Sequence, residues 1–211
     1  MKKFEGLNIQ AEDCNSIKIH DDCSFLDSKI TVKGQGNVIE ISKALVYRSL
    51  IMNLQGNNKH ITIQESSKNI NNLKIVSIRG DNQTIFIGRN LSCGGLEIQM
   101  NDGDENLAIG EDCLFSWGIK MRTSDGHSVI DLSTGKAINL PKDINIGSHV
   151  WIGEDVRVLK GVKIPNNSIV GSYSVITKPF KEENTVIAGH PAKVVKYNVD
   201  WHREMPFRYN N

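Results

Sequence analysis

Residues 146–177 read IGSHVW IGEDVR VLKGVK IPNNSI VGSYSV IT when the sequence is divided into groups of six. An aliphatic residue opens each group, at Ile146, Ile152, Val158, Ile164, Val170 and Ile176. A second register carries Val150, Val156 and Val162, and then the small Ser168 and Ser174. An α-helix repeats every 3.6 residues and a strand every two, so neither produces this pattern. A period of six is typical of a parallel β-helix, in which six residues form one flat side of a coil.

Each group of six also predicts how its coil is built. The aliphatic residue points into a prism, the residue of the second register fills a corner, and glycine bends the chain between them. Plentiful Ile and Val with only 6% aromatic residues suit stacked ladders of β-branched side chains. The fold class expected is therefore all-β, a solenoid of parallel strands.

Upstream of this stretch the repeat is looser, but a turn followed by a strand recurs. The strands end at Ile41, Ile63, Ile87 and Ile109, which lie 22, 24 and 22 residues apart. We expect the segment from Gly126 to Leu132 to repeat the same turn. These spacings indicate one coil per repeat with extra residues at a corner, and about nine or ten coils in all.

The whole chain, residues 1–211, is thus expected to form a single solenoid domain. Within it we distinguish irregular coils over residues 1–121, a turn and loop over 122–143, regular coils over 144–179, and a C-terminal strand and capping helix over 180–211. Ser133–Asp143 lacks the six-residue pattern and predicts a loop that leaves the prism. Asn198–Phe207 is expected to form a short helix that covers the open end, because solenoid ends need capping.

Composition narrows the classes of function. A formal net charge of +1 with 23% charged residues gives no support for a nucleic-acid-binding or membrane-surface protein. The start, MKKFEG, has no apolar stretch behind its lysines, and no run of about 18 apolar residues follows, so neither a signal peptide nor membrane insertion is expected. The default location is cytoplasmic.

The four cysteines contain no CxxC pair and no spacing typical of a metal site. Cys23 and Cys113 fall at corner positions of the repeat, and Cys93 falls at an inward position. We expect these three thiols to be buried and to behave as small hydrophobic residues, while Cys14 has no assigned position, and no metal is expected.

The stretches Val150–Gly153, Val175–Lys178 and Ala188–Lys193 together resemble the hexapeptide-repeat acyltransferases. The segment Arg122–His127 is most similar to bacterial O-acetyltransferases of surface polysaccharides such as capsules, including those that act on polymerised sialic acid. The resemblance implies a left-handed β-helix, acetyl-CoA as co-substrate and homotrimers with active sites between subunits. The general rule for parallel crossovers favours the right hand, so handedness rests on the resemblance alone.

Acetyl transfer from a thioester to a sugar hydroxyl needs a group that accepts the hydroxyl proton as it attacks. A histidine that titrates near neutrality suits this role. His127 is the candidate general base, since it lies at a coil corner beside the loop, among Ser124, Asp125 and Ser128. Asp125 or Asp131 could orient its ring. The alternative is that each of these is a solvated turn residue.

Trp151 stands between a corner residue and an inward residue, so its ring is expected to point out of the prism. The resemblance places it against the thioester end of CoA, where an N–H of Trp151 or Gly153 could stabilise the oxyanion; packing between subunits is the alternative. The resemblance also implies that Ser172, Thr177, Lys178 and Lys193 bind the cofactor, against the alternative of ordinary surface residues. His149 is expected at a surface or interface, and no role is argued for His190.

The function expected is therefore O-acetylation of a saccharide, with polymer and monomer as alternative acceptors. An N-acetyltransferase of a nucleotide-linked amino sugar is the nearest alternative. A zinc-dependent carbonic anhydrase on the same prism would need three histidines, and His127 and His149 have no third partner at close spacing. A non-catalytic scaffold would not require His127, Trp151 and Lys178 together.

Overall fold

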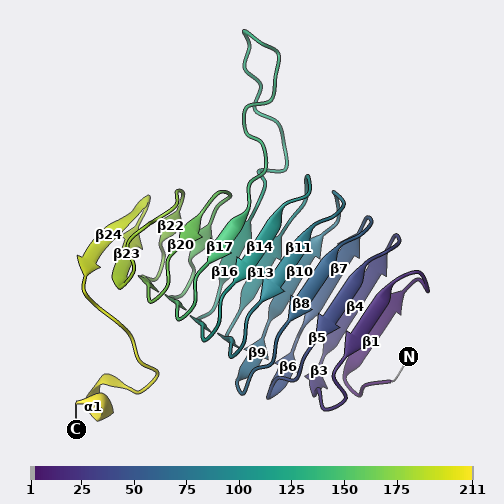
Figure 1. Cartoon of the computed structure of the whole chain (residues 1–211), viewed down its shortest axis with the longest axis horizontal. Coiled ribbons are helices and arrows are strands. Elements are labelled where there is room, and N and C mark those ends of the chain that lie inside the picture. The colour runs from purple at the N-terminus through teal and green to yellow at the C-terminus, as the bar shows by residue number, and fades with distance from the viewer. Residues whose placement is uncertain (1–2, 211) are drawn as a thin grey trace.

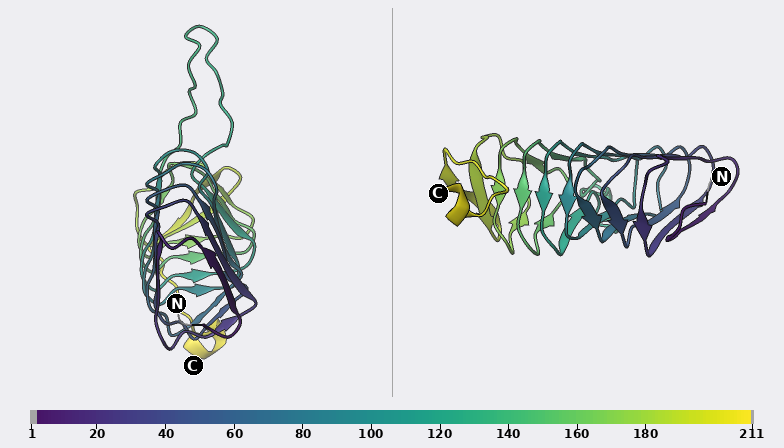
Figure 2. Two further views of the ribbon diagram at one scale, coloured as in Figure 1. Left: turned by 90° about the vertical axis from the view of Figure 1, so that its right-hand side faces the viewer. Right: turned by 90° about the horizontal axis from the view of Figure 1, so that it is seen from below.

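The computed structural model describes residues 3–210; Met1, Lys2 and Asn211, the ends of the expected first and last segments, lie outside the described residues. The chain winds as a three-sided prism of parallel strands (Figures 1 and 2). One side, sheet A, contains β1 (Leu7–Ala11), β4 (Ser28–Lys33), β7 (Ile51–Gln55), β10 (Leu73–Ser77), β13 (Leu96–Gln99), β16 (Ile119–Arg122), β19 (Arg157–Val158) and β22 (Val175–Ile176).

The other two sides complete each coil. Sheet B contains β2 (Ser16–Ile19), β5 (Val38–Ile41), β8 (His60–Ile63), β11 (Thr84–Ile87), β14 (Asn106–Ile109), β17 (Ile144–Ile146) and β20 (Lys163–Ile164). Sheet C contains β3 (Phe25–Leu26), β6 (Val46–Arg48), β9 (Asn69–Asn71), β12 (Ser92–Cys93), β15 (Leu114–Phe115), β18 (Trp151–Ile152), β21 (Ile169–Val170), β23 (Thr185–Gly189) and β24 (Ala192–Tyr197). All strand pairs are parallel except β23 with β24. The predicted all-β solenoid is confirmed.

The aliphatic ladder forms the core of the regular coils, as predicted. Its six members from Ile146 to Ile176 are at most 3% exposed. The corner register, from Val150 to Ser174, is equally buried. Each inward side chain stacks on its counterpart in the next coil, as Ile146 does on Ile164. The core is one continuous cluster of buried side chains that runs from Phe25 to Ala192.

The second-position glycines of the repeat, such as Gly153, act differently from the expected bend. A Cβ atom at Gly153 would lie 2.7 Å from the backbone nitrogen of Ser172 in the next coil, so these corners need glycine for clearance. The left-handed backbone conformation falls at the fourth position of each group, on Gly161 with φ of 77° and on polar residues such as Asp155 and Asn167 with φ of 53° and 54°. Short polar side chains tolerate that conformation through local hydrogen bonds.

Residues 124–142, here called the arm, leave the prism at the corner between sheets A and B (Figures 1 and 2). The arm begins earlier than the expected loop at Ser133. The prediction that Gly126–Leu132 repeats the coil turn is wrong, because Ile130 pairs antiparallel with Ala137 inside the arm and not with a neighbouring coil.

The number of coils is also smaller than expected. Sheet A has eight strands, not nine or ten, since the arm and the residues after Gly189 lie outside the coils. The helix α1 (Pro206–Tyr209) is only four residues long and buries none of them, so it does not provide the cap expected of Asn198–Phe207. Phe180 and Ile187, both buried, close the last coil instead.

The thiols follow the repeat. Cys93 and Cys113 are buried, and burial raises the pKa of each to about 12, while Cys23 is half-buried with a pKa of about 11 for the same reason. Cys14 is exposed, and all four are free thiols. No helix within residues 3–210 has the length and apolar character needed to cross a bilayer.

The stacked ladder makes a quantitative prediction about stability. Ile164→Ala should lower the free energy of unfolding by about 2–5 kcal/mol, because the coils on either side prevent collapse around the cavity. The neighbouring Lys163→Ala removes an outward, exposed side chain of the same strand and should change it by less than about 0.5 kcal/mol. Denaturant unfolding of both variants measures the difference, and equal losses would contradict the inward–outward assignment.

Candidate active site

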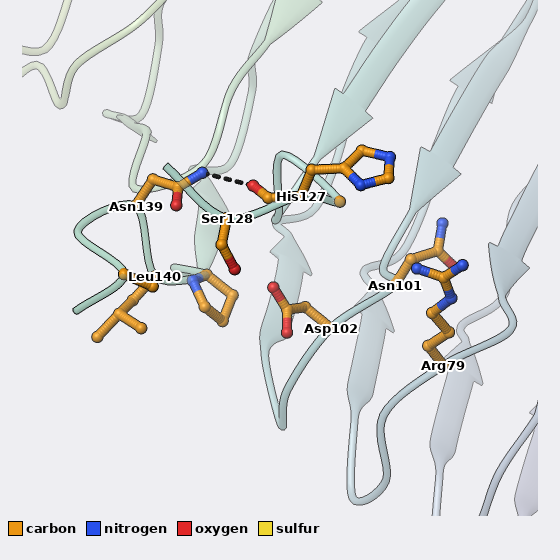
Figure 3. A pocket seen from close by; sticks show the side chains of 10 residues that line it. Arg79, Asn101, Asp102, His127, Ser128, Asn139 and Leu140 are labelled. Atoms are coloured by element: carbon orange, nitrogen blue, oxygen red, sulfur yellow. Dashed lines mark hydrogen bonds between the residues drawn. The ribbon is translucent and has the colours of Figure 1, made fainter. Parts of the chain in front are cut away.

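His127 lies at the base of the arm, on the rim of a hollow of about 230 Å³. The wall opposite the arm comes from the corners of the two preceding coils and includes Arg79, Asn101 and Asp102. Figure 3 shows the imidazole ring projecting toward the side on which Arg79 and Asn101 lie, while Asp102 faces Ser128. His127 therefore lies where it was expected, at a coil corner beside the arm.

The base of the arm is fastened by one hydrogen-bonded cluster. Asn139 donates through Nδ2 to the backbone oxygen of His127 and to Asp125, both at 2.8 Å. Lys160, on the next coil, donates to Asp125 and to the backbone oxygen of Asn139. The hydrogen bonds from Lys160 and Asn139 lower the pKa of Asp125, so its carboxylate stays ionised and holds both strands of the arm.

Neither carboxylate that the sequence offered as a partner contacts the His127 ring. Asp125 is occupied by Asn139 and Lys160. Asp131 accepts hydrogen bonds from Ser133 and Thr134 in the tip of the arm, where they lower its pKa. Among residues 3–210, no side chain forms a hydrogen bond with the imidazole, so its ring nitrogens face the hollow and solvent.

Trp151 lies on a different side of the prism. It projects from sheet C, which is opposite the A–B corner that carries His127, and its side chain is 38% exposed. It borders an open groove of about 650 Å³ that also contains Trp117 and Leu45. Within one chain, His127 and Trp151 therefore do not share a cleft.

The residues expected to bind the cofactor fall into two groups. Gly153 and Ser172 stack at the corner between sheets C and A, where Ser172 Oγ accepts a hydrogen bond from the amide of Glu154. Lys193, on β24, lies opposite Ala188, which contacts Gly171 of that corner. Thr177 and Lys178 follow β22 and are exposed on the same corner line as the arm.

His149 has a structural environment that the sequence did not reveal. Its ring stacks on Trp201 at 4.3 Å, and Nδ1 lies 2.8 Å from a carboxylate oxygen of Asp112. Arg203 donates to the other oxygen of Asp112 at 2.9 Å. The C-terminal segment thus folds back along the coils, and Trp201 also lies 6.3 Å from the Trp151 ring. The available signal was Trp201 itself, a large aromatic residue in a mostly polar stretch, Asn198–Glu204.

Two arginines near His127 were also missed. Arg79 and Arg122 line an adjoining hollow of about 200 Å³ that includes His127 and Asp125, and the charge of Arg122 contributes to the lowered pKa of Asp125. Arg79, Asp102 and Asp125 follow one another at 23 residues, the coil spacing. Projecting that spacing upstream from Asp125 would have placed Arg79 beside His127. No group of three or more potential metal ligands occurs among the described residues.

Comparison with known proteins identifies the family of the chain. The family model for the bacterial transferase hexapeptide (six repeats) matches residues 143–178. A polysialic acid O-acetyltransferase of Neisseria meningitidis is 40% identical over 197 residues, which cover 82% of this chain and 89% of that protein. A polysialic acid O-acetyltransferase of Escherichia coli O1:K1 / APEC is 35% identical over 130 residues, 61% of this chain and 41% of that protein.

Two solved structures share the whole fold. The polysialic acid O-acetyltransferase OatWY superposes with a TM-score of 0.75 and 33% identity, covering 94% of this chain and 92% of that one. The polySia-specific acetyltransferase NeuO gives a TM-score of 0.83 and 28% identity over 97% and 86% of the two chains. The left-handed coil implied by the resemblance is thereby confirmed, against the general preference for the right hand. The chain belongs to the hexapeptide-repeat acyltransferases and is an acetyltransferase of the left-handed β-helix type.

Proposed function

We propose that this enzyme moves an acetyl group from acetyl-CoA to a hydroxyl of an acidic surface polysaccharide, in the cytoplasm where the donor is made. The observation that carries the proposal is His127 at the mouth of a hollow that it shares with Arg79 and Arg122. The likeness to polysialic acid O-acetyltransferases over most of the chain supports it. The chain acts as a single solenoid domain, and the base of its arm carries the proposed general base.

The chemistry assigned to His127 is proton transfer. Its imidazole accepts the proton of the acceptor hydroxyl while that oxygen attacks the thioester carbonyl and forms the new C–O bond. A backbone or indole N–H at Trp151 or Gly153 stabilises the oxyanion. The C–S bond then breaks, and the proton passes from the imidazolium to the leaving CoA thiolate. The proposed reaction steps do not use a metal ion.

His127 and Trp151 lie on different sides of one prism, so the proposal requires a second subunit. Closed three-fold symmetry would bring the arm of one protomer against the Trp151 face of the next, and three equivalent sites would result. The arm carries the exposed apolar side chains that such a contact needs, with Leu132 97% exposed. They are Val129, Ile130, Leu132, Ile138 and Leu140.

The cofactor would lie along the corners near the C-terminal end. Ser172 is exposed at the corner between sheets C and A and would contact the pantetheine arm, with the buried Gly153 packed against it from the preceding coil. Lys178 and Lys193 are exposed cations at that end and would bind the phosphates of CoA, with Thr177 beside them.

Arg79 and Arg122 give the acceptor its chemical class. A guanidinium group binds a carboxylate through two parallel hydrogen bonds. Asp125, whose pKa the charge of Arg122 helps to lower, is held by Asn139 and Lys160, so both guanidinium groups have donors left for a ligand. A polymer with a carboxylate on each sugar would place one carboxylate at this pair while a hydroxyl reaches His127.

Replacing His127 tests the base. His127→Ala should lower turnover by about 10²–10⁴-fold at saturating acetyl-CoA, with little change in melting temperature because the side chain is exposed. His20→Ala removes an exposed histidine that follows β2 in the first coil, at the corner between sheets B and C, and should leave turnover unchanged. Transfer of labelled acetyl to oligosialic acid is the assay, and a His127→Ala enzyme that keeps more than about a tenth of native turnover contradicts the assignment.

Replacing the arginines tests the acceptor class. Arg79→Gln and Arg122→Gln should each raise the KM for an acidic oligosaccharide by about tenfold, because one charge-assisted contact is lost. The KM for acetyl-CoA should not change, and the effect should shrink at high salt. Arg48→Gln, on sheet C, is the matched control. Equal KM values for acidic and neutral acceptors in the native enzyme would contradict an acidic substrate.

A further inference from the structure

A column of polar side chains fills the inside of the A–B corner, one residue per coil, directly before each of the first five strands of sheet B. The residues of this polar column are Asn15, Asn37, Lys59, Gln83 and Glu105. The last four are at most 3% exposed. At the corner between sheets C and A, the corresponding interior is apolar and contains Leu50, Leu73 and Leu96. The fold therefore accepts an apolar corner, and a polar column with charged members needs another explanation.

Lys59 is fully buried and binds the coil that carries Arg79. Its Nζ donates to the backbone oxygen of Arg79 at 3.0 Å, and to the backbone oxygen and Oγ of Ser77 at 3.1 and 2.6 Å. A further bond of 2.8 Å goes to Gln83 Oε1. Burial lowers the pKa of Lys59 to about 8, against the opposing influence of Asp81 and Glu105, so the ammonium remains charged at neutral pH.

Gln83 and Glu105 extend the column to the base of the arm. Gln83 Nε2 donates to Glu105 Oε2 at 2.5 Å, and Thr123 Oγ1 lies 3.4 Å from Glu105 Oε1. Thr123 is fully buried, and its backbone oxygen accepts the amide of Lys142 at 3.0 Å. The two ends of the arm therefore meet at Thr123, which Glu105 contacts and which lies four positions before His127.

One buried network thus touches both sides of the proposed acceptor site. At one end Lys59 bonds to the backbone of Arg79, and at the other end Glu105 contacts Thr123, four residues before His127. We infer that Lys59 and Glu105 are positioning residues, which hold the acceptor-binding arginine and the arm that carries the base in register across two coils. This inference rests on the proposed function of the His127 site.

Methionine variants remove the polar contacts at similar side-chain size. Lys59→Met and Glu105→Met should each raise the KM for the acidic acceptor by about tenfold and leave the KM for acetyl-CoA unchanged, since small misplacements at a site are costly. Glu105→Gln keeps groups that can bond to Gln83 and Thr123 but removes the charge, so it should lower the melting temperature and retain a near-native acceptor KM. Leu73→Ala, in the apolar corner, should also lower only the melting temperature.

Hydrogen exchange supplies a readout that does not depend on turnover. The amides of Gly126 and Lys142, at the two ends of the arm, should exchange about tenfold faster in Lys59→Met or Glu105→Met and at the native rate in Leu73→Ala. If the methionine variants fail to fold, Thr123→Val, which replaces the hydroxyl by a methyl group, takes their place and should speed the exchange of the same two amides about tenfold.

The outcomes separate this inference from the proposed function. Methionine variants that lose thermal stability but keep native acceptor KM and arm exchange would overturn the positioning role. A Glu105→Gln enzyme as impaired toward the acceptor as Glu105→Met would also overturn it, because the lost charge and not the hydrogen bond would be responsible. A native protein that transfers no acetyl group refutes the proposed function, while arm exchange still tests the polar column.

Discussion

Contact between identical positions of successive coils is the constraint on which the rest of the molecule depends. Inward aliphatic side chains stack at the strand spacing of about 4.8 Å, and the corners must let the backbone of one coil pass close to the next. Gly153 shows how little space the corners leave between coils, since even one Cβ atom there would clash with the next coil. Because the stack fixes every corner, residues 22–24 positions apart become neighbours. Arg79, Asp102 and Asp125 are brought together in this way, although nothing in their local sequence connects them.

The regular coils were predictable because each inward position there carries an aliphatic side chain at a constant spacing of six. The polar column was not, because Lys59 and Glu105 occupy a corner where an apolar residue was expected, and their partners Ser77 and Thr123 lie 18 residues away. The arm was assigned too short for a related reason: Val129 and Ile130 have the apolar character of a strand, yet they pair within the arm and face solvent. The tail was misjudged because its anchor, Trp201, packs on His149 through contacts 52 residues apart.

His127 and Trp151 illustrate what the fold of one chain can and cannot provide. The prism holds His127 at the A–B corner, where the cluster of Asp125, Asn139 and Lys160 fastens the base of the arm. It holds Trp151 on sheet C, where Trp201 lies beside it. It also separates them by the width of the core. Rigid coils cannot close this separation by a conformational change, since the core between them is continuous. A reaction that uses both residues therefore has to be assembled from two protomers.

Subunit mixing tests that central claim most directly. His127→Ala and Trp151→Ala proteins, each inactive alone, are unfolded together in equal amounts, refolded and assayed for acetyl transfer. If each site takes His127 from one protomer and Trp151 from its neighbour, about one site in four receives both native residues, and activity returns to about a quarter of the native value. A mixture that stays as inactive as its components, while native enzyme carried through the same refolding recovers, would show that both residues must come from one chain and would contradict the account.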